Sequence, residues 1–423
     1  MEYQEYLSIK QEMYEHFMSL IEDENDIEED FEEIIKIIQK AKCQENSTEF
    51  KGLLHLISEL DKNHHRSSTL FTKIEGILFH YSEYIKRSFT NEELLNVFSK
   101  NQRILHFLIK KNIIAVDDSM TKLLHKKHHP EFVIRQYPGE NKPNYESEKA
   151  KYYAKTLMYE DYKYYFYLDV KSTLSEKERS IIEEELLRKD ENIFDNFEKK
   201  CEIGENDSYI SFLIRKDMIG EFVSYVTRAN ISAKSEISPS IFETNPLLKS
   251  RRATLIEYAA FFGSIKIFNY LRMKNADLTP SLWIYAIHSN NVDMIHILED
   301  CDIEPEDKTY MECLKESIKC HHNKLARYIE NNHFEESMEK KEHDFKNNSI
   351  SYGFHYYNYE FIEYSDDCQQ QLYYACLYDH FPIVKLFIKN KEVELNKTII
   401  YNIILIKLHS SLRYLIFKLH FKI

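Results

Sequence analysis

Acidic side chains are concentrated between residues 22 and 33, at a density that invites comparison with a calcium site. An EF-hand loop takes its ligands from alternate positions and has glycine at the sixth. The run from Asp23 to Glu28 instead has isoleucine at its fifth position and glutamate at its sixth. We therefore interpret the stretch as a solvated loop and helix start, where carboxylates favour the positive end of the helix dipole.

Histidine is a common protein ligand of zinc, and it occurs here in three clusters. Zinc ligands come as spaced pairs of Cys or His on facing elements, and the chain has no C-x-x-C pair to accompany its histidines. We predict loop or surface histidines and no metal site. The clusters are His64–His65, His125 with His128–His129, and His321–His322 beside Cys320.

Aromatic and lysine residues alternate from Tyr152 to Tyr167, a composition that suits stacking against nucleic-acid bases. Glu160, Asp161 and Asp169 interrupt the pattern, so we predict packing between helix layers instead. The motifs G-x-x-x-x-G-K-[ST], G-x-S-x-G, H-E-x-x-H and G-x-G-x-x-G are missing from the sequence. We therefore expect no catalytic residues, no cofactor and no enzymatic activity.

The chain has 423 residues and a formal net charge of −14 at pH 7. This charge argues against a nucleic-acid partner, because affinity for phosphates comes from Lys and Arg, and it suits a soluble monomer. Seven dispersed cysteines are typical of reduced thiols in the cytosol or nucleus. The first residues have no secretory-signal pattern. We predict an intracellular protein, cytoplasmic or nuclear.

Amphipathic helices account for the first third of the chain. Apolar residues keep helical spacing in residues 3–21, 31–38 and 50–60. Thr90 and Glu93 have the capping-box form that starts a helix, and a second short helix covers residues 104–109. Two short helices joined by so brief a loop lie antiparallel. Since no alternating strand pattern of useful length occurs, the predicted fold class is all-α.

Proline and glycine cluster only in residues 136–144, which is the best candidate for a domain boundary. From residue 396 onward the chain has no Asp or Glu and carries five Lys or Arg residues among apolar ones. We predict an N-terminal helical region over 1–140, a helical connector over 141–204, a repeat array over 205–398 and an atypical basic, apolar tail over 399–423.

Residues 254–271 are repeated in a shorter form by residues 281–298. Tyr258–Ala259 returns as Tyr285–Ala286, and Leu271 returns as Leu298. Residues 317–329 are a worn third copy, residues 374–388 are a clear fourth one, and residues 208–226 supply one more helix pair. A period of roughly 20–50 residues with two helical patterns per unit predicts a stacked helical solenoid, which is stable from about three units.

This repeat resembles the ankyrin repeat. The run Thr254-Leu-Ile-Glu-Tyr-Ala-Ala260 stands where that family has Thr-Pro-Leu-His-x-Ala-Ala, and Asn275-Ala-Asp277 resembles its Gly-Ala-Asp turn. Leu255, Glu257 and Asn275 depart from the family pattern, although Asn tolerates the positive φ that such a turn needs. The resemblance implies an ankyrin-like helical solenoid, preceded in this chain by degenerate helical repeats.

Residues 202–209 and 240–245, together with residues 254–264, extend the resemblance. They are similar to a large, uncharacterised family of ankyrin-like proteins that is expanded in certain protists and defined by a domain of unknown function. The similarity spans residues 200–390 and extends to the N-terminal helices. It implies no enzymatic activity, because the family has none assigned.

In such stacks the exposed loop tips and the concave row of helices bind partners, while apolar repeat positions stabilise the fold. We therefore predict a non-enzymatic protein–protein interaction scaffold whose partner is another protein. The contact candidates are Lys274, Asn275, Asp277, His288, Ser289, Asp302 and Glu304. The residues predicted to be structural are Tyr258, Ala259, Ala286, Ile267, Leu271 and Leu298.

Two other functions stay open. The basic C-terminal tail suits an interfacial amphipathic helix, which would make the chain a peripheral membrane adaptor. Lys407 and Arg413 interrupt the tail too often for a membrane span, and we prefer an atypical cap or unrelated read-through sequence. The second alternative places an enzyme or adaptor activity in the N-terminal helices.

Overall fold

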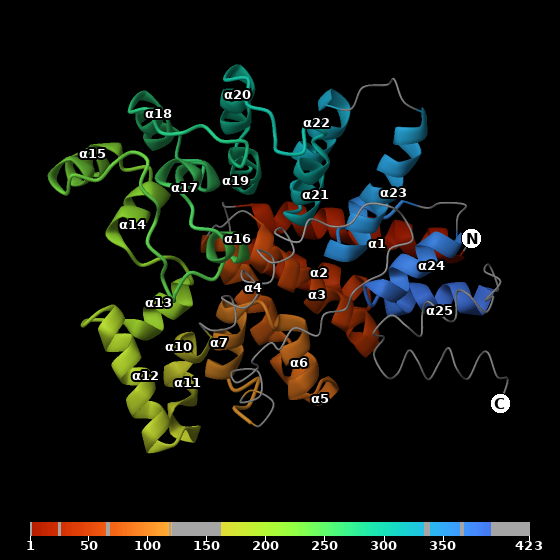
Figure 1. Cartoon of the computed structure of the whole chain (residues 1–423). Coiled ribbons are helices and arrows are strands. Elements are labelled where there is room, and N and C mark those ends of the chain that lie inside the picture. The colour runs from red at the N-terminus through yellow and green to blue at the C-terminus, as the bar shows by residue number, and fades with distance from the viewer. Residues whose placement is uncertain are drawn as a thin grey trace, which may run out of the picture. The chain divides into compact units, whose positions relative to one another are not determined.

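Helices dominate the structure, a computed structural model that describes residues 2–23, 27–64, 68–117, 120, 162–333, 339–363 and 368–390 (Figure 1). Within these residues there is no strand, and one isolated β-bridge pairs Glu236 with Thr254. The predicted all-α class is confirmed. None of the described helices is long and apolar enough to cross a membrane. The chain forms two compact units, one of residues 81–303 and one that combines residues 1–80 with 304–423.

The unit of residues 81–303 begins with short helices that pack around α7 (Gln102–Lys110). The predicted capping box is present, because Glu93 accepts from the backbone of Thr90 and Thr90 accepts from the backbone of Glu93. The helices that contact α7 are α6 (Asn91–Phe98), α11 (Tyr167–Val170) and α13 (Phe197–Ile203). The other elements here are α5 (Ser82–Ser88), α10 (Tyr162–Tyr165), η2 (Lys171–Thr173) and α12 (Glu176–Lys189).

Tyrosine side chains of α10 and α11 fill the space between these helices. Tyr162, Tyr165 and Tyr167 are all buried. The Tyr165 hydroxyl donates to the carbonyl of Cys201 at 2.6 Å, so a buried polar group is satisfied. The predicted packing of this aromatic stretch between helix layers is therefore confirmed for Tyr162, Tyr165, Phe166 and Tyr167, whereas Tyr164 is half-buried and residues 152–161 lie outside the described residues.

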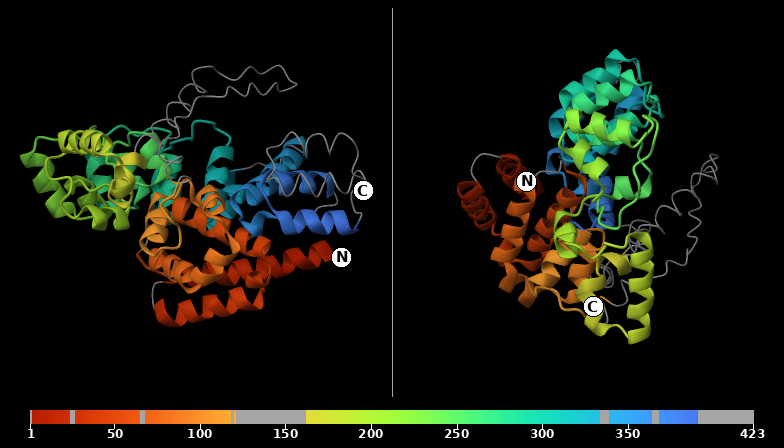
Figure 2. Two further views of the ribbon diagram at one scale, coloured as in Figure 1. Left: turned by 90° about the horizontal axis from the view of Figure 1, so that it is seen from below. Right: turned by 90° about the vertical axis from the view of Figure 1, so that its left-hand side faces the viewer.

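Three helix pairs follow one another later in the same unit (Figure 2). The first helices of the pairs pack in succession, α14 on α17 and α17 on α19, and α15 packs on α18. The pairs are α14 (Tyr209–Arg215) with α15 (Ile219–Arg228), α17 (Leu255–Phe261) with α18 (Ile265–Met273), and α19 (Leu282–Ser289) with α20 (Val292–Asp300). A short helix, α16 (Pro246–Ser250), lies in the connection between α15 and α17.

Each of these pairs reverses direction at a residue with left-handed backbone geometry. The φ angle is +47° at Asp217, +66° at Gly263 and +49° at Asn290. The second helices end in the same way, at Asn230 with φ of +52° and at Asn275 with φ of +59°. Asp, Asn and Gly tolerate this region better than other residues, so the turn positions follow from residue type.

Hydrogen bonds join consecutive pairs. The Ser264 hydroxyl donates to the carbonyl of Ile214 at 2.5 Å, and the Asp217 carboxylate accepts from the backbone N–H of Ile267 at 3.0 Å. Apolar packing accompanies these bonds, and all six residues predicted to be structural are buried. They are Tyr258, Ala259, Ala286, Ile267, Leu271 and Leu298.

The second unit joins two stretches that are far apart in sequence. Helix α1 packs on α2, α4 and α25, and the amide of Gln11 on α1 donates to the carbonyls of Tyr359 and Ile362 at 3.3 and 3.2 Å. The elements of the first stretch are α1 (Glu2–Glu22), α2 (Ile27–Lys40), η1 (Cys43–Glu45), α3 (Ser47–Asn63) and α4 (Ser68–His80). Those of the second are α21 (Met311–Lys319), α22 (Asn323–His333), α23 (Glu339–Tyr356), η3 (Tyr359–Phe361), α24 (Cys368–Leu377) and α25 (Phe381–Asn390).

Two of the predicted repeat copies, residues 317–329 and 374–388, lie in helix pairs of this unit. The pair α21 and α22 turns at His321 with φ of +58°, and the pair α24 and α25 turns at Asp379 with φ of +62°. The single helix α23, which packs on α21 and α24, separates the two pairs along the chain. The series of pairs is thus interrupted within the predicted array of residues 205–398.

One of the predicted segment boundaries lies next to a helix end. The boundary between residues 204 and 205 follows Gly204, the residue that ends α13 with φ of +67°. The boundary segment 136–144, the histidines at 125, 128 and 129, and the tail of residues 399–423 lie outside the described residues.

Candidate functional site

Exposed loop ends carry five of the seven predicted contact residues. Lys274, Asn275 and Asp277 follow α18, and Asp302 takes the corresponding left-handed position after α20 with φ of +52°. Asp277 lies 2.5 Å from the ammonium group of Lys234, so its carboxylate is already paired within the unit. Glu304, in the other unit, is also exposed.

His288 and Ser289 are buried, contrary to the expectation of an exposed contact surface. The Ser289 hydroxyl donates to the carbonyl of Ala286 at 2.6 Å and accepts from the backbone N–H of Asn291 at 3.2 Å. The ring of His288 stacks on Phe261, with centroids 4.9 Å apart. Both side chains therefore stabilise the repeat itself, because they lie among the buried residues of α19.

The histidines of the other unit also differ from the prediction. His64, His321 and His322 are buried rather than on the surface. Nδ1 of His64 lies 2.7 Å from the carbonyl oxygen of Cys320, and Nδ1 of His321 lies 2.8 Å from the hydroxyl of Tyr14. These hydrogen bonds satisfy one ring nitrogen of His64 and one of His321, which lowers the cost of burying these two rings in the core.

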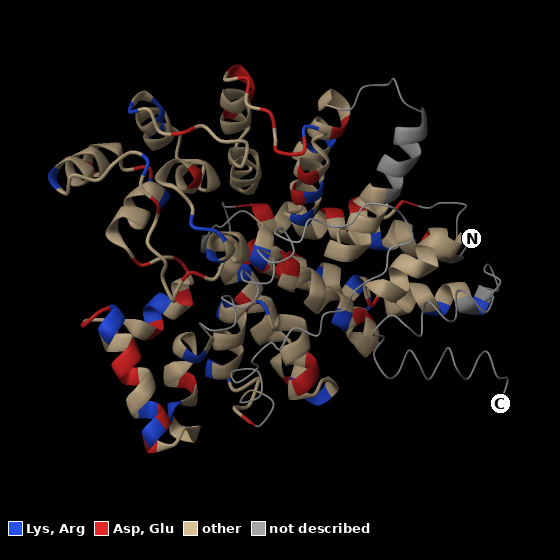
Figure 3. Ribbon diagram, viewed as in Figure 1, with Lys and Arg blue, Asp and Glu red and all other residues tan. Residues whose placement is uncertain are grey.

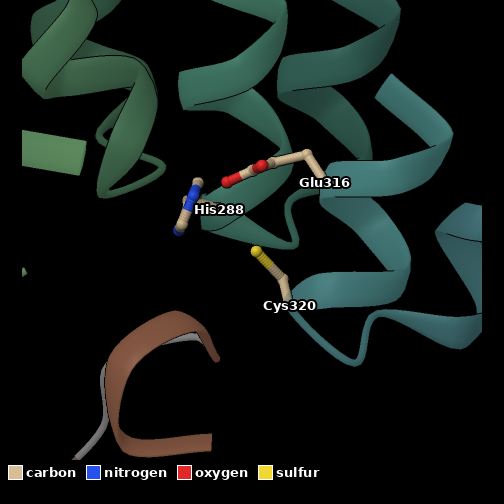
Figure 4. A group of neighbouring side chains, drawn as sticks. All are labelled: His288, Glu316 and Cys320. Atoms are coloured by element: carbon tan, nitrogen blue, oxygen red, sulfur yellow. The ribbon is translucent and has the colours of Figure 1, made fainter. Parts of the chain in front are cut away.

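Glu316 and Cys320 lie near the C-terminal end of α21, where Figure 4 shows them beside one another. Glu316 accepts from the ammonium group of Lys319 at 2.6 Å. Burial raises the pKa of the Cys320 thiol well above its usual value, which disfavours the thiolate that metals bind. A structural zinc site takes four ligands, so these two groups carry no metal assignment. Figure 4 also labels His288, which belongs to the unit of residues 81–303.

A small hollow lies beside α16 in the unit of residues 81–303. Its volume is about 70 Å³. Polar walls come from the loop before α14 and the segment before α16, and the helix α17 supplies Tyr258. The lining residues are Asn206, Ile237, Ser238, Pro239, Ser240, Glu243, Leu248, Lys249, Arg251, Arg252, Ala253 and Tyr258.

Three basic side chains line this hollow in a chain that is acidic as a whole. Lys249 on α16 donates to the side-chain oxygen of Gln102 at 2.8 Å. Arg251 and Arg252 follow α16 and are exposed, and neither side chain has a hydrogen-bond or ion-pair partner among the described residues. Figure 3 shows the resulting basic segment between α16 and α17.

Buried hydrogen bonds hold the acidic lining residue of the hollow, Glu243. Glu243 is 4% exposed, and its two oxygens accept from the backbone N–H groups of Asn206 and Asn245 at 3.3 and 2.8 Å. Behind it, Arg215 pairs with Glu205 at 2.7 Å and donates to the hydroxyl of Tyr258 at 3.1 Å. Burial raises the pKa of Tyr258, so this phenol keeps its proton.

None of the residues that line the hollow was predicted from the sequence to be a binding residue. The only local signal is the basic cluster Lys249-Ser-Arg-Arg252, which follows residues 240–245 of the family resemblance. Asn206 and Tyr258, which line the hollow together with that cluster, come from segments that no spacing rule connects to it. Comparisons with family models, curated proteins and solved structures give no match for this chain.

Proposed function

We propose that this chain is a non-enzymatic protein–protein interaction scaffold built on ankyrin-like stacked helix pairs. The observation that supports the proposal is the repeated turn geometry. Left-handed residues recur at Asn230, Asn275 and Asp302, each at the end of the second helix of a pair. Repetition of this kind presents loop tips in a row, the arrangement that repeat proteins use for binding.

The surface near these tips mixes charge with an isolated apolar side chain. Met273, the last residue of α18, directly precedes the tip residue Lys274 and is 72% exposed. Lys274 and Asp302 stand at the adjacent tips. An exposed apolar side chain beside charged ones suits an interface with another protein, whose centre is apolar and whose rim is polar.

The cysteines support a role without covalent chemistry. A cysteine nucleophile reacts as its thiolate, which requires a pKa near or below neutrality. Burial raises the pKa of Cys201, Cys313 and Cys320, and it raises the pKa of Cys376 to about 12. These four thiols stay protonated, and they act as small core residues.

The test is a quantitative pull-down with mass spectrometry that compares three forms of the full chain. The test variant combines Lys274→Glu with Asp302→Lys, which inverts two loop tips and leaves the net charge unchanged. The matched control combines Lys177→Glu with Glu191→Lys, two exposed residues outside the helix pairs. We expect a protein that the wild type and the control retain and the loop-tip variant loses. Identical retention by all three forms would contradict the proposal.

A further inference from the structure

We propose that the hollow beside α16 binds a phosphoryl group carried by a side chain of the partner protein. This inference rests on the proposed function, which supplies a protein partner, and it adds the chemistry by which that partner is recognised. Binding of the partner protein to this chain would then depend on phosphorylation of the partner.

The size of the hollow selects a single functional group. Pockets for cofactors and other small molecules usually measure roughly 300–1,000 Å³. The hollow has about 70 Å³, which is room for a few water molecules or one compact anion. A nucleotide would not fit, whereas the end of one side chain would.

Charge selects a doubly negative group. Lys249, Arg251 and Arg252 supply three positive charges, and Glu243 supplies one negative charge, which leaves a formal net charge of +2. A phosphorylated serine or threonine carries about −1.5 to −2 at neutral pH, whereas a carboxylate carries only −1. Arginine is the residue best suited to a phosphoryl group, because its planar N–H groups bind two oxygens at once.

A buried donor is among the lining residues of the hollow. Tyr258 is 1% exposed, and its hydroxyl oxygen accepts from Arg215. No described residue accepts the proton of this hydroxyl. The O–H group can therefore donate to an oxygen of the ligand. Because Glu205 neutralises Arg215, the donation adds a directional bond without another full charge.

The walls hold their geometry before a ligand enters. The amide of Asn206 donates to the carbonyl of Ser238 at 2.7 Å, which fixes two lining segments against each other. Glu243 is held by two backbone N–H groups, so its carboxylate does not pair with Arg251 or Arg252. A site arranged in advance spends less free energy on ordering when it binds.

The experiment measures retention of the full chain on three immobilised peptide libraries with degenerate flanking positions. The fixed central residue is phosphoserine in one library, serine in the second and glutamate in the third. The test variant combines Arg251→Ala with Arg252→Ala, and the control combines Lys216→Ala with Arg228→Ala. Both remove two exposed basic residues from the same unit. Tyr258→Phe removes only the buried hydroxyl, and thermal melting verifies that each variant is folded.

We expect the phosphoserine library to retain the wild type and the control variant, and an excess of inorganic phosphate to displace both. The arginine double variant should bind at least about tenfold more weakly, because charge-assisted hydrogen bonds to phosphate are strong ones. Tyr258→Phe should bind a few-fold more weakly. Equal retention on the serine or glutamate library, or an undiminished signal from the arginine double variant, would overturn the phosphoryl assignment. The loop-tip pull-down would then still decide the scaffold function separately.

Discussion

At the scale of single residues, the helix pairs depend on alanines that a larger side chain cannot replace. Ala259 and Ala286 are fully buried in α17 and α19, the two helices that pack directly on each other. Lys274, the residue directly after α18, is exposed. The buried alanines therefore have no room for a larger side chain, whereas Lys274 is surrounded by solvent.

We therefore expect Ala259→Leu or Ala286→Leu to lower the free energy of unfolding by about 1–3 kcal/mol, because three extra carbon atoms must displace packed neighbours. Lys274→Ala should change it by no more than about 0.5 kcal/mol. Urea unfolding followed by circular dichroism measures both. Equal losses at the buried and exposed positions would show that the helix register is wrong.

Lys73 is a second residue with an unusual environment, since its ammonium group is buried on α4. It donates to the carbonyls of Leu20 and Asp23, at the end of α1, and to the carboxylate of Asp30 on α2. These distances are 2.6, 2.6 and 2.8 Å. One side chain thus satisfies the free carbonyls at a helix end and neutralises a buried carboxylate.

We expect Lys73→Met to cost about 3–5 kcal/mol, because Asp30 would be left as an unpaired charge in the core. Lys40→Met, which removes the partner of Glu12 in an exposed ion pair, should cost less than about 1 kcal/mol. Chemical denaturation of the two variants gives the comparison. Combining Lys73→Met with Asp30→Asn should recover part of the loss, and no recovery would argue against the ion pair.

At the scale of elements, two helix pairs reverse direction next to buried histidines. His321 is the left-handed residue between α21 and α22, and its Nδ1 bonds to Tyr14. His380 is the residue directly before α25, and its Nε2 lies 2.7 Å from the carbonyl oxygen of Phe354. Burial lowers the pKa of His321 to about 3 and that of His380 to about 4.

These histidines should make the unit of residues 1–80 and 304–423 sensitive to acid. In the unfolded chain each histidine takes up a proton near pH 6.5, whereas the folded rings stay neutral until the pH is near 3 to 4. Their contribution to stability is complete above pH 6.5 and is lost as the pH falls toward 4. The expected slope is about 1.4 kcal/mol per pH unit for each histidine.

Urea unfolding between pH 7 and pH 5 measures this slope, before most carboxylates titrate. The variant His380→Asn keeps a polar side chain but does not titrate, so its slope should be smaller by one histidine. A variant with the wild-type slope would contradict the assignment to His380. Replacing exposed His296, which pairs with Glu299 on α20 in the other unit, provides the control.

At the scale of the whole molecule, the two compact units differ in how the chain builds them. The unit of residues 81–303 is continuous in sequence, whereas the other needs residues 1–80 and residues 304 onward together. Tyr14 and Gln11 make their long-range hydrogen bonds with His321, Tyr359 and Ile362. A fragment that ends at residue 303 keeps one unit and removes residues 304–423 of the other.

We expect a fragment of residues 81–303 to be helical and to melt cooperatively, because its core is complete. A fragment of residues 1–303 should aggregate or lose residues 1–80 to protease, since α1 and α3 would expose the apolar faces that α25 covers. Circular dichroism and limited proteolysis measure the two outcomes. A stable, protease-resistant 1–303 fragment would contradict this division of the chain.

The sequence by itself determined the helices and many of their ends. Helix position depends on apolar spacing within one segment, and the capping box at Thr90 and Glu93 depends on residues three positions apart. The turns at Gly263, Asn275 and Asn290 follow from residue types that tolerate positive φ. Interactions of this kind are local, so the order of residues is enough to predict them.

Only the tertiary structure decided which segments meet and which polar groups are buried. The burial of His64, His321 and Ser289 was not predictable, because desolvation depends on neighbours that are distant in sequence. The hollow likewise combines Asn206, Arg252 and Tyr258 from separate segments. Side chains acquire such surroundings only when the helices pack against one another. Packing brings together residues that are far apart in the sequence, and their spacing along the chain does not predict that they will meet.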